Sequence, residues 1–171
     1  IALGGNALLK RGEELSASVQ RQNCKLAAAA IAEVIAAGHD VIVTHGNGPQ
    51  VGLMALQDAA YDSRLASPLD VLCAESQGMI GYMIAQELQN ALNGARSVAV
   101  MVTRVEVDPK DPAFKSPSKP IGPLYSQREA AALAASHGWT IMADGEHFRR
   151  AVVSLKDAPT TEIDTIRHLA G

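Results

Sequence analysis

The sequence predicts an α/β fold built around a parallel sheet, and two kinds of segment support this prediction. The runs at residues 41–44 and 98–103 are short, rich in β-branched residues and apolar on both faces, which is typical of strands inside a parallel sheet. Longer stretches with helical spacing lie at residues 19–37 and 74–92. Strands that alternate with helices form βαβ units, so we expect a three-layer αβα sandwich with a mainly parallel central sheet.

The first half of the chain supplies most of these elements. Residues 1–3 form a short apolar run that we expect to be a strand. The helix at residues 19–37 has candidate N-caps in Ser16 and Ser18, and Gly38 is placed to end it. The strand at residues 41–44 leads into glycines and a proline, after which we expect a further helix over residues 50–61.

The second half contains one strong helix signal and one segment that breaks the pattern. Ser126 is followed three residues later by Glu129, a capping box that predicts a helix over residues 126–137. Five of the eight prolines lie between Asp108 and Pro123, so this segment is neither a helix nor a central strand. We expect a long loop there, of the kind that often covers a binding site. A strand at residues 139–142 and a helix at residues 162–169 complete the predicted elements.

Composition excludes several classes of protein. The chain has 171 residues, 47% of them hydrophobic and 19% charged, which favours one globular domain over a disordered chain. The formal net charge of −3 argues against a dedicated nucleic-acid binder. No apolar run is long enough to span a bilayer and no signal peptide is visible, so we expect no membrane association. With only two cysteines, a cytoplasmic location is the expectation.

Two glycine-rich loops follow predicted strands and form the main candidate site. The first contains Gly4, Gly5 and Asn6, and the second contains Gly46, Asn47 and Gly48 ahead of a proline. Glycines at strand ends let the backbone approach a ligand closely, and a helix N-terminus offers free amides to an anion. Neither loop matches a Walker or a Rossmann pattern, and a pair of ordinary turns is the alternative interpretation.

Lys119 is the third candidate, because it lies in a segment framed by prolines. Pro117, Pro120 and Pro123 surround it and limit the freedom of the backbone that carries it. A positioned lysine can neutralise the charge on a transferring phosphoryl group. The alternative is a solvated surface lysine.

Other reactive residue types give weaker signals. The five histidines show no metal-ligand spacing with one another or with the cysteines, so we predict no metal site. His45 lies beside a candidate loop, but we interpret it as structural. Cys24 and Cys73 are interpreted as core thiols rather than nucleophiles. The Arg149-Arg150 pair could contact phosphate or carboxylates, and we favour the structural role.

Taken together, the motifs resemble those of carbamate kinase, a member of the amino acid kinase family, over its N-terminal part. The matching stretches cover almost the whole chain: Ile1-Ala2-Leu3-Gly4-Gly5-Asn6-Ala7-Leu8, Thr44-His45-Gly46-Asn47-Gly48-Pro49-Gln50-Val51-Gly52, Ser76-Gln77-Gly78-Met79-Ile80-Gly81-Tyr82-Met83, Val105-Glu106-Val107-Asp108-Pro109-Lys110-Asp111-Pro112-Ala113-Phe114 and Pro117-Ser118-Lys119-Pro120-Ile121-Gly122-Pro123. The second loop and the proline-framed lysine distinguish carbamate kinase within the wider family.

The resemblance implies reversible phosphoryl transfer between ATP and carbamate, giving ADP and carbamoyl phosphate. By this likeness Gly4, Gly5 and Asn6 face the phosphoryl group, and Gly46, Asn47 and Gly48 hold the carbamate or carbamoyl end. Lys119 reaches the phosphates, so Lys119, Asn6 and Gly5 are the implied catalytic residues. Mg²⁺ is implied as a companion of ATP or ADP, without a dedicated protein cage in this part of the chain.

The resemblance also implies an organisation for the chain. Residues 1–171 would form the domain that binds carbamate and carbamoyl phosphate, with a small protruding subdomain at about residues 105–152 that carries the lysine. The family is dimeric, and the helix at residues 74–92 is a candidate contact. Arginine metabolism is one pathway in which such an enzyme serves.

The chain departs from the family in one major respect, which leaves a second hypothesis open. Family members are nearly twice this length, and the half that supplies the nucleotide pocket has no counterpart here. We therefore expect the 171 residues alone to have little or no kinase activity. The alternative is a truncated, non-catalytic relative that binds anions or dimerises. A kinase acting on another substrate of the wider family is disfavoured by the proline-framed Lys119.

Overall fold

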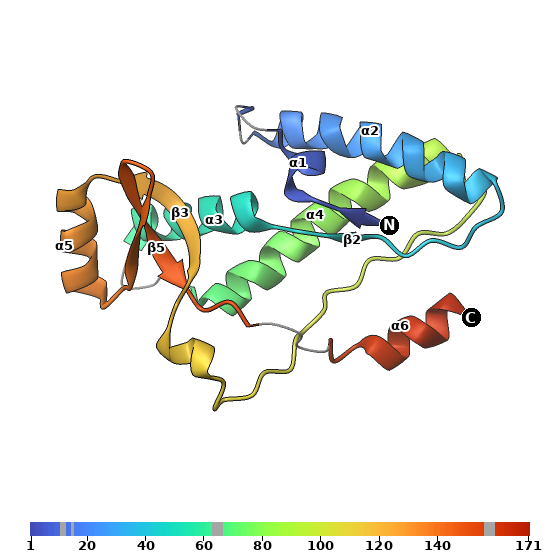
Figure 1. Cartoon of the computed structure of the whole chain (residues 1–171). Coiled ribbons are helices and arrows are strands. Elements are labelled where there is room, and N and C mark those ends of the chain that lie inside the picture. The colour runs from blue at the N-terminus through green and yellow to red at the C-terminus, as the bar shows by residue number, and fades with distance from the viewer. Residues whose placement is uncertain (11–12, 15, 63–66, 156–159) are drawn as a thin grey trace.

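Two long helices packed over a pair of short parallel strands form the centre of the structure (Figure 1). The structure is a computed structural model, and it describes residues 1–10, 13–14, 16–62, 67–155 and 160–171. The described elements, in chain order, are β1 (Ala2–Leu3), α1 (Gly5–Leu8), α2 (Ala17–Ala36), β2 (Thr44–His45), α3 (Gly48–Asp62), α4 (Leu69–Leu92), the 3₁₀ helix η1 (Pro112–Lys115), β3 (Lys119–Tyr125), α5 (Gln127–His137), β4 (Ile141–Asp144), β5 (His147–Val152) and α6 (Ile163–Ala170).

The core lies between α2 and α4, which contact one another along their lengths. One cluster of buried residues joins α1, α2 and α4, and its members are Leu8, Cys24, Ile80, Met83 and Ile84. A second cluster lies further along the same two helices and consists of Ala28, Ile31, Leu88 and Leu92. Leu3 in β1 packs against both clusters, so the first strand is fixed to the whole helix pair.

Helix ends occur where the capping residues predicted them. Ser16 caps α2, since its hydroxyl oxygen accepts the backbone N–H of Val19 at 3.4 Å. Gly38 follows that helix with φ +94°, a left-handed conformation that favours glycine. The capping box of α5 is also confirmed: the Ser126 N–H donates to the Glu129 carboxylate at 2.9 Å, and the Glu129 N–H donates to the Ser126 hydroxyl.

The predicted strand at residues 98–103 was wrong, because none of these residues belongs to a described strand. The segment runs back alongside α4 instead (Figure 1). Its backbone is held by a side chain, since the Gln77 carboxamide accepts the Thr103 N–H at 2.9 Å and donates to the Thr103 carbonyl at 3.2 Å. A side chain of α4 thus takes the place of a neighbouring strand.

The run at residues 41–44 is only partly strand and only partly buried. The strand β2 begins at Thr44, and residues 41–43 precede it without regular structure. Val41 and Val43 pack against the second core cluster, whereas Ile42 is 49% exposed. The expectation of burial on both faces was therefore wrong for this run, because α2 and α4 cover the side to which only the alternate residues point.

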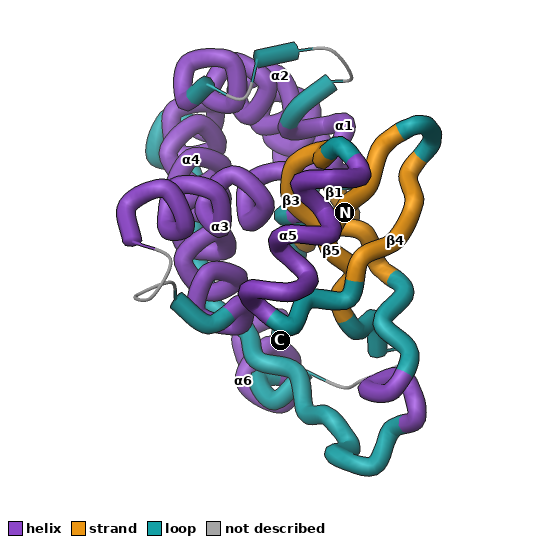
Figure 2. Tube along the Cα trace, turned by 90° about the vertical axis from the view of Figure 1, so that its left-hand side faces the viewer, coloured by secondary structure: helices purple, strands orange, loops and turns teal. Residues whose placement is uncertain are grey.

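A second, antiparallel sheet has the order β3-β5-β4 and lies to one side of α2, α3 and α4 (Figure 2). The predicted loop at residues 108–123 was wrong in part, since it contains η1 and the start of β3. The prolines are tolerated because β3 is an edge strand, where Pro120 needs no partner for an N–H. The predicted strand at residues 139–142 is found slightly later, as β4. The α/β class of fold is confirmed, but among the described strands only β1 and β2 pair in parallel, whereas we expected a mainly parallel sheet.

Helix α6 is attached to the rest of the chain through Glu162 and Arg104. The Glu162 carboxylate accepts the Arg104 backbone N–H at 2.8 Å and its guanidinium Nε at 2.9 Å. These hydrogen bonds from Arg104 lower the pKa of Glu162 to about 2. An isolated bridge between Val105 and Thr160 lies beside them and completes the junction.

We predict that Gly81→Ala destabilises the protein while Gly78→Ala on the same helix does not. A Cβ at Gly81 would lie 2.5 Å from Val100 Cγ1, so the Val100 side chain would have to shift, at a cost of about 1 kcal/mol. A Cβ at Gly78 meets nothing within 4 Å, and alanine there favours the helix. Urea unfolding of both variants measures the difference. Equal stabilities would contradict the packing of Val100 on α4.

Stability is predicted to fall in acid partly because of Glu162. A carboxylate whose pKa is lowered on folding stabilises the folded state above its ordinary value of 4.5, and this stabilisation is lost as the pH falls toward about 2. In Glu162→Gln that pH dependence should be reduced, as followed by urea unfolding across the same range. Asp164→Asn is the control, since its exposed pair with Arg167 is peripheral. An unchanged pH profile in Glu162→Gln would contradict the assignment.

Candidate functional site

Parallel pairing of β1 with β2 brings the two predicted loops to one edge of the strand pair. The register places Ala2 opposite Thr44 and Leu3 opposite His45, so both strands end side by side. The Gly46 N–H donates to the Leu3 carbonyl at 3.3 Å and joins the start of one loop to the end of the other strand. The two loops, interpreted from the sequence as one candidate site, therefore adjoin in the structure. The two loops lie where ligands bind in α/β sheets, beyond the carboxyl ends of the strands.

The first loop turns directly into the short helix α1. The Gly4 carbonyl accepts the Ala7 N–H at 2.9 Å, which starts that turn. The backbone N–H groups of Gly5 and Asn6 occupy the first positions of α1, where a helix leaves such groups without an intrahelical acceptor. The side chain of Asn6 lies outside the described part of the structure, so its predicted contact with a phosphoryl group stays a prediction.

The second loop is tied to the core by Asn47. Its carbonyl accepts the Val51 N–H at 2.9 Å and opens α3, while its side-chain amide donates to the Ser76 hydroxyl at 2.7 Å. Ser76 is fully buried in α4 and donates in turn to the Cys73 carbonyl at 2.8 Å. The side-chain amide group of Asn47 therefore has a structural partner, and this hydrogen bond attaches the second loop to α4.

The amides available in the second loop differ from the set predicted. We expected Gly46, Asn47 and Gly48 all to offer free N–H groups, but that of Gly46 is used by Leu3. The N–H groups of Asn47 and Gly48 have no acceptor among the described residues. They lie at the N-terminus of α3, whose first turn contains no acidic residue. The helix dipole and these two amides together favour an anion at this end.

The fold of the described residues does not require glycine at positions 4, 46 and 48 of the two loops. None of Gly4, Gly46 and Gly48 has a positive φ, and a Cβ built on any of them meets nothing within 4 Å. Neither backbone strain nor packing inside the described structure thus explains the absence of a side chain. Open space beside unpaired amides is what a backbone-lined ligand site requires.

Lys119 is not brought into contact with either loop. It is the first residue of β3, is paired with Val152 and is exposed. Its ammonium group makes no hydrogen bond or ion pair with a described residue. The strand that carries it contacts α3, the helix that the second loop begins. Its predicted approach to phosphate remains a prediction.

The residues interpreted as structural have structural partners. His45 Nδ1 lies 3.2 Å from the Gly46 carbonyl oxygen. Arg149 pairs with Asp144 at 2.7 Å, and the guanidinium of Arg150 lies over the Trp139 ring at 4.5 Å. Burial raises the pKa of the Cys24 thiol, which keeps it protonated and unreactive.

Sequence reasoning missed the polar residues that support the site. Ser76 was quoted only as part of a motif, although a serine in the middle of an otherwise apolar helical face is a signal for a buried polar contact. Gln50, which is 2% exposed, likewise appears only within a motif, and Gln20, which is 5% exposed, was not singled out. Within the described ranges, no three His, Cys, Asp or Glu side chains are grouped as a metal site.

The fold and the loop pair define an α/β protein in which two glycine-containing loops meet at one edge of a parallel strand pair. No family model matches the chain. The chain is 57% identical to carbamate kinase from Rhizobium meliloti over 154 residues, which are 90% of this chain and 47% of that protein. It is 51% identical to carbamate kinase from Haemophilus influenzae over 169 residues, or 99% of this chain and 54% of that protein.

Solved structures give the same result. A crystal structure from Aeropyrum pernix K1 superposes with a TM-score of 0.92 at 37% identity, covering 99% of this chain and 56% of that one. Carbamate kinase from Giardia lamblia bound to AMP-PNP gives a TM-score of 0.84 at 40% identity, over 98% of this chain and 55% of that one. The resemblance predicted from the sequence is confirmed: this chain is related in sequence and fold to carbamate kinases, and it spans about half the length of the relatives it matches.

Gly48→Ala is predicted to fold as stably as the unaltered chain. The new methyl group meets nothing within 4 Å, and alanine in the first turn of α3 loses less conformational entropy on folding than glycine. We expect a free energy of unfolding that is unchanged or raised by up to about 1 kcal/mol, measured by urea denaturation. A loss of more than about 1 kcal/mol would show that the glycine serves the fold rather than a ligand.

Proposed function

We propose that this chain forms the carbamate- and carbamoyl phosphate-binding part of a carbamate kinase, which transfers a phosphoryl group reversibly between ATP and carbamate. The observation that carries the proposal is the pair of adjoining loops, in which the N–H groups of Asn47 and Gly48 have no acceptor among the described residues, found in a chain 57% identical to a carbamate kinase. Kinase activity of the whole enzyme and its substrates are part of this proposal, since the chain matches only about half of its relatives' length.

The geometry suits a reaction in which the protein stabilises charge and forms no covalent bond. Phosphoryl transfer needs positioned donors around oxygens that carry negative charge, and backbone amides supply these without moving. The amides of Gly5 and Asn6 would face the phosphoryl group of carbamoyl phosphate. Those of Asn47 and Gly48 would hold the carbamoyl end, while Gly4 and Gly46 leave room for close approach.

Lys119 would supply the positive charge that the loops lack. Its ammonium group is exposed and unpaired among the described residues, so no ion pair has to be broken before it binds an anion. The strand β3 carries it on the sheet that contacts α3. We propose that it approaches the phosphoryl oxygens when substrate is bound and acts as a point charge there.

We propose that the phosphoryl donor is ATP, accompanied by Mg²⁺. The carbamate kinase of Giardia lamblia has been solved with AMP-PNP, and we propose that ATP is the nucleotide here also. Mg²⁺ is usually held by phosphates and few protein groups. The described residues form no cage of three acidic, histidine or cysteine side chains, so no step proposed here runs through a protein-bound ion.

The assembly and location of the protein follow as lesser proposals. We propose a homodimer that uses α4, on which Tyr82 is 59% and Val71 is 42% exposed. Among the described residues, none of the helices has the length and hydrophobicity needed to cross a membrane. A cytoplasmic role in arginine metabolism accords with the similarity to carbamate kinases.

A non-catalytic binding or dimerisation module is the second candidate, because the two adjoining loops could bind an anion without any transfer reaction. ATP formation from ADP and carbamoyl phosphate separates the two candidates. The loops and Lys119 contain no group that recognises adenine, so we expect the 171-residue chain to bind carbamoyl phosphate but to form little or no ATP. ATP formation at the rate of a complete kinase would show that the chain needs nothing further.

Lys119→Ala is predicted to weaken binding of carbamoyl phosphate about tenfold, because one charge-assisted contact is lost. The stability of the fold should change little, since the side chain is exposed. Isothermal titration calorimetry with freshly dissolved carbamoyl phosphate measures the effect.

The matched control for this variant is Lys110→Ala, a change at an exposed lysine before η1 whose backbone N–H bonds Asp108. We expect it to bind as the unaltered chain does. Equal affinities of both variants and the unaltered chain would remove Lys119 from the site, and absence of any binding heat in the unaltered chain would overturn the proposed function.

A further inference from the structure

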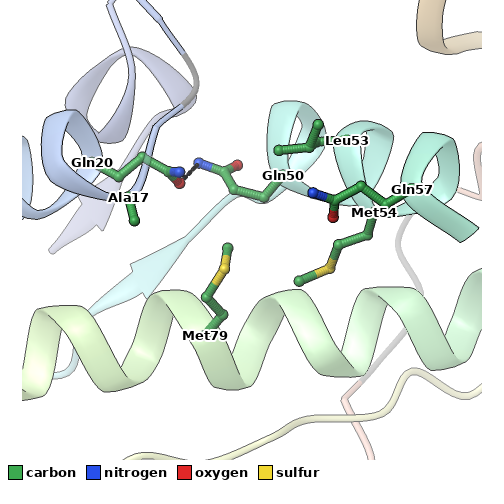
Figure 3. Close-up of a pocket in the computed structure, with 7 residues that line it drawn as sticks. All are labelled: Ala17, Gln20, Gln50, Leu53, Met54, Gln57 and Met79. Carbon is green, nitrogen blue, oxygen red and sulfur yellow. Dashed lines mark hydrogen bonds between the residues drawn. The ribbon is translucent and has the colours of Figure 1, made fainter.

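A cavity of about 240 Å³ lies between α2, α3 and α4 and involves none of the residues assigned to the carbamoyl phosphate site (Figure 3). Its lining residues are Ala17, Gln20, Gln50, Leu53, Met54, Gln57 and Met79. Gln20 and Gln50 are buried, whereas Ala17 and Gln57 are exposed. The cavity therefore has a buried polar wall and a rim that reaches solvent.

The backbone carbonyl of Ser16, which can only accept a hydrogen bond, fixes the orientation of the buried Gln20 and Gln50 side-chain amides. The Gln20 side-chain N–H₂ donates to the Ser16 carbonyl at 3.3 Å, which leaves the Gln20 oxygen as an acceptor. That oxygen accepts the Gln50 side-chain N–H₂ at 3.0 Å (Figure 3). Because the Gln20 oxygen can only accept, the Gln50 atom that bonds it is the side-chain nitrogen, and the other Gln50 atom is the oxygen Oε1.

The series of hydrogen bonds from Ser16 through Gln20 to Gln50 ends in an acceptor that has no partner among the described residues. The side-chain oxygen Oε1 of Gln50 is buried, and no described residue donates to it. Gln50 itself is 2% exposed, so bulk water does not compensate this oxygen. A buried carbonyl oxygen of this kind calls for an N–H or O–H donor.

The other residues that line the cavity determine the polarity and charge of a ligand that could bind there. Leu53, Met54 and Met79 supply apolar surface, and methionine adapts its shape to an occupant. None of the lining residues carries a charge, so a charged ligand would lose its hydration without gaining a partner. The volume of about 240 Å³ exceeds the roughly 30 Å³ share of a single water several times over.

We propose that this cavity is a binding site for a small uncharged molecule that presents one N–H or O–H donor beside an apolar body. The donor would complete the hydrogen bonding of Gln50 Oε1, and the apolar body would lie against the leucine and methionine side chains. The site is separate from the proposed kinase function and does not rest on it. Gln50 is two residues beyond Gly48, so binding of a ligand in the cavity should also change the environment of the residues at the start of α3.

Nuclear magnetic resonance of the ¹⁵N-labelled 171-residue chain tests the proposal with three aromatic probes of similar size and different polarity. Benzyl alcohol has an O–H donor, toluene has no polar group and benzaldehyde has only an acceptor. We expect benzyl alcohol to shift the Gln50 and Gln20 side-chain N–H₂ signals saturably, with a Kd in the roughly millimolar range. Toluene and benzaldehyde should bind at least threefold more weakly.

Gln50→Leu provides the matched variant, since it keeps the apolar wall and removes the acceptor. The preference for benzyl alcohol over toluene should disappear in it. Should this variant fail to fold, the order of the three probes on the unaltered chain decides the question alone. Equal affinity for all three probes, or no saturable shift at Gln50 because ordered water alone fills the cavity, would overturn the proposal.

Discussion

The parallel pairing of β1 with β2 is the interaction on which the candidate site depends. Each strand has only two residues, so the pair is held by few hydrogen bonds, among them Thr44 N–H to the Ile1 carbonyl at 2.9 Å. Its stability comes instead from Leu3, which packs against both clusters of the core. Because the strands run in the same direction and end together, two loops separated by about forty residues offer their amides to one place.

Hydrogen bonds between polar side chains attach the second loop and α3 to the helices of the core. Asn47 reaches down to Ser76, and Ser76 is anchored on the backbone of α4. Gln20 and Gln50 join α2 to the start of α3 in the same way. Such contacts stabilise modestly when complete and destabilise strongly when one member is lost. They fix the position of α3, and with it the N-terminus that faces the proposed anion.

Local signals in the sequence predicted the fold better than long-range ones. Ser16 and the Ser126–Glu129 box were found because a cap depends on neighbours a few residues away. The strand predicted at residues 98–103 failed because apolar composition cannot show whether a backbone will meet another strand or a glutamine side chain. The site was predicted in part: glycines marked both loops, but the use of the Gly46 amide by Leu3 depends on strand register, which single residues do not encode.

The central claim is that both loops bind one anion together. The most direct measurement is a titration of the ¹⁵N-labelled chain with carbamoyl phosphate, followed at the backbone amides of Gly5, Asn6, Asn47 and Gly48. The structure predicts that all four signals move with a single Kd, because the strand pair places both loops beside the same ligand. Shifts confined to one loop, or two loops responding with different affinities, would contradict it.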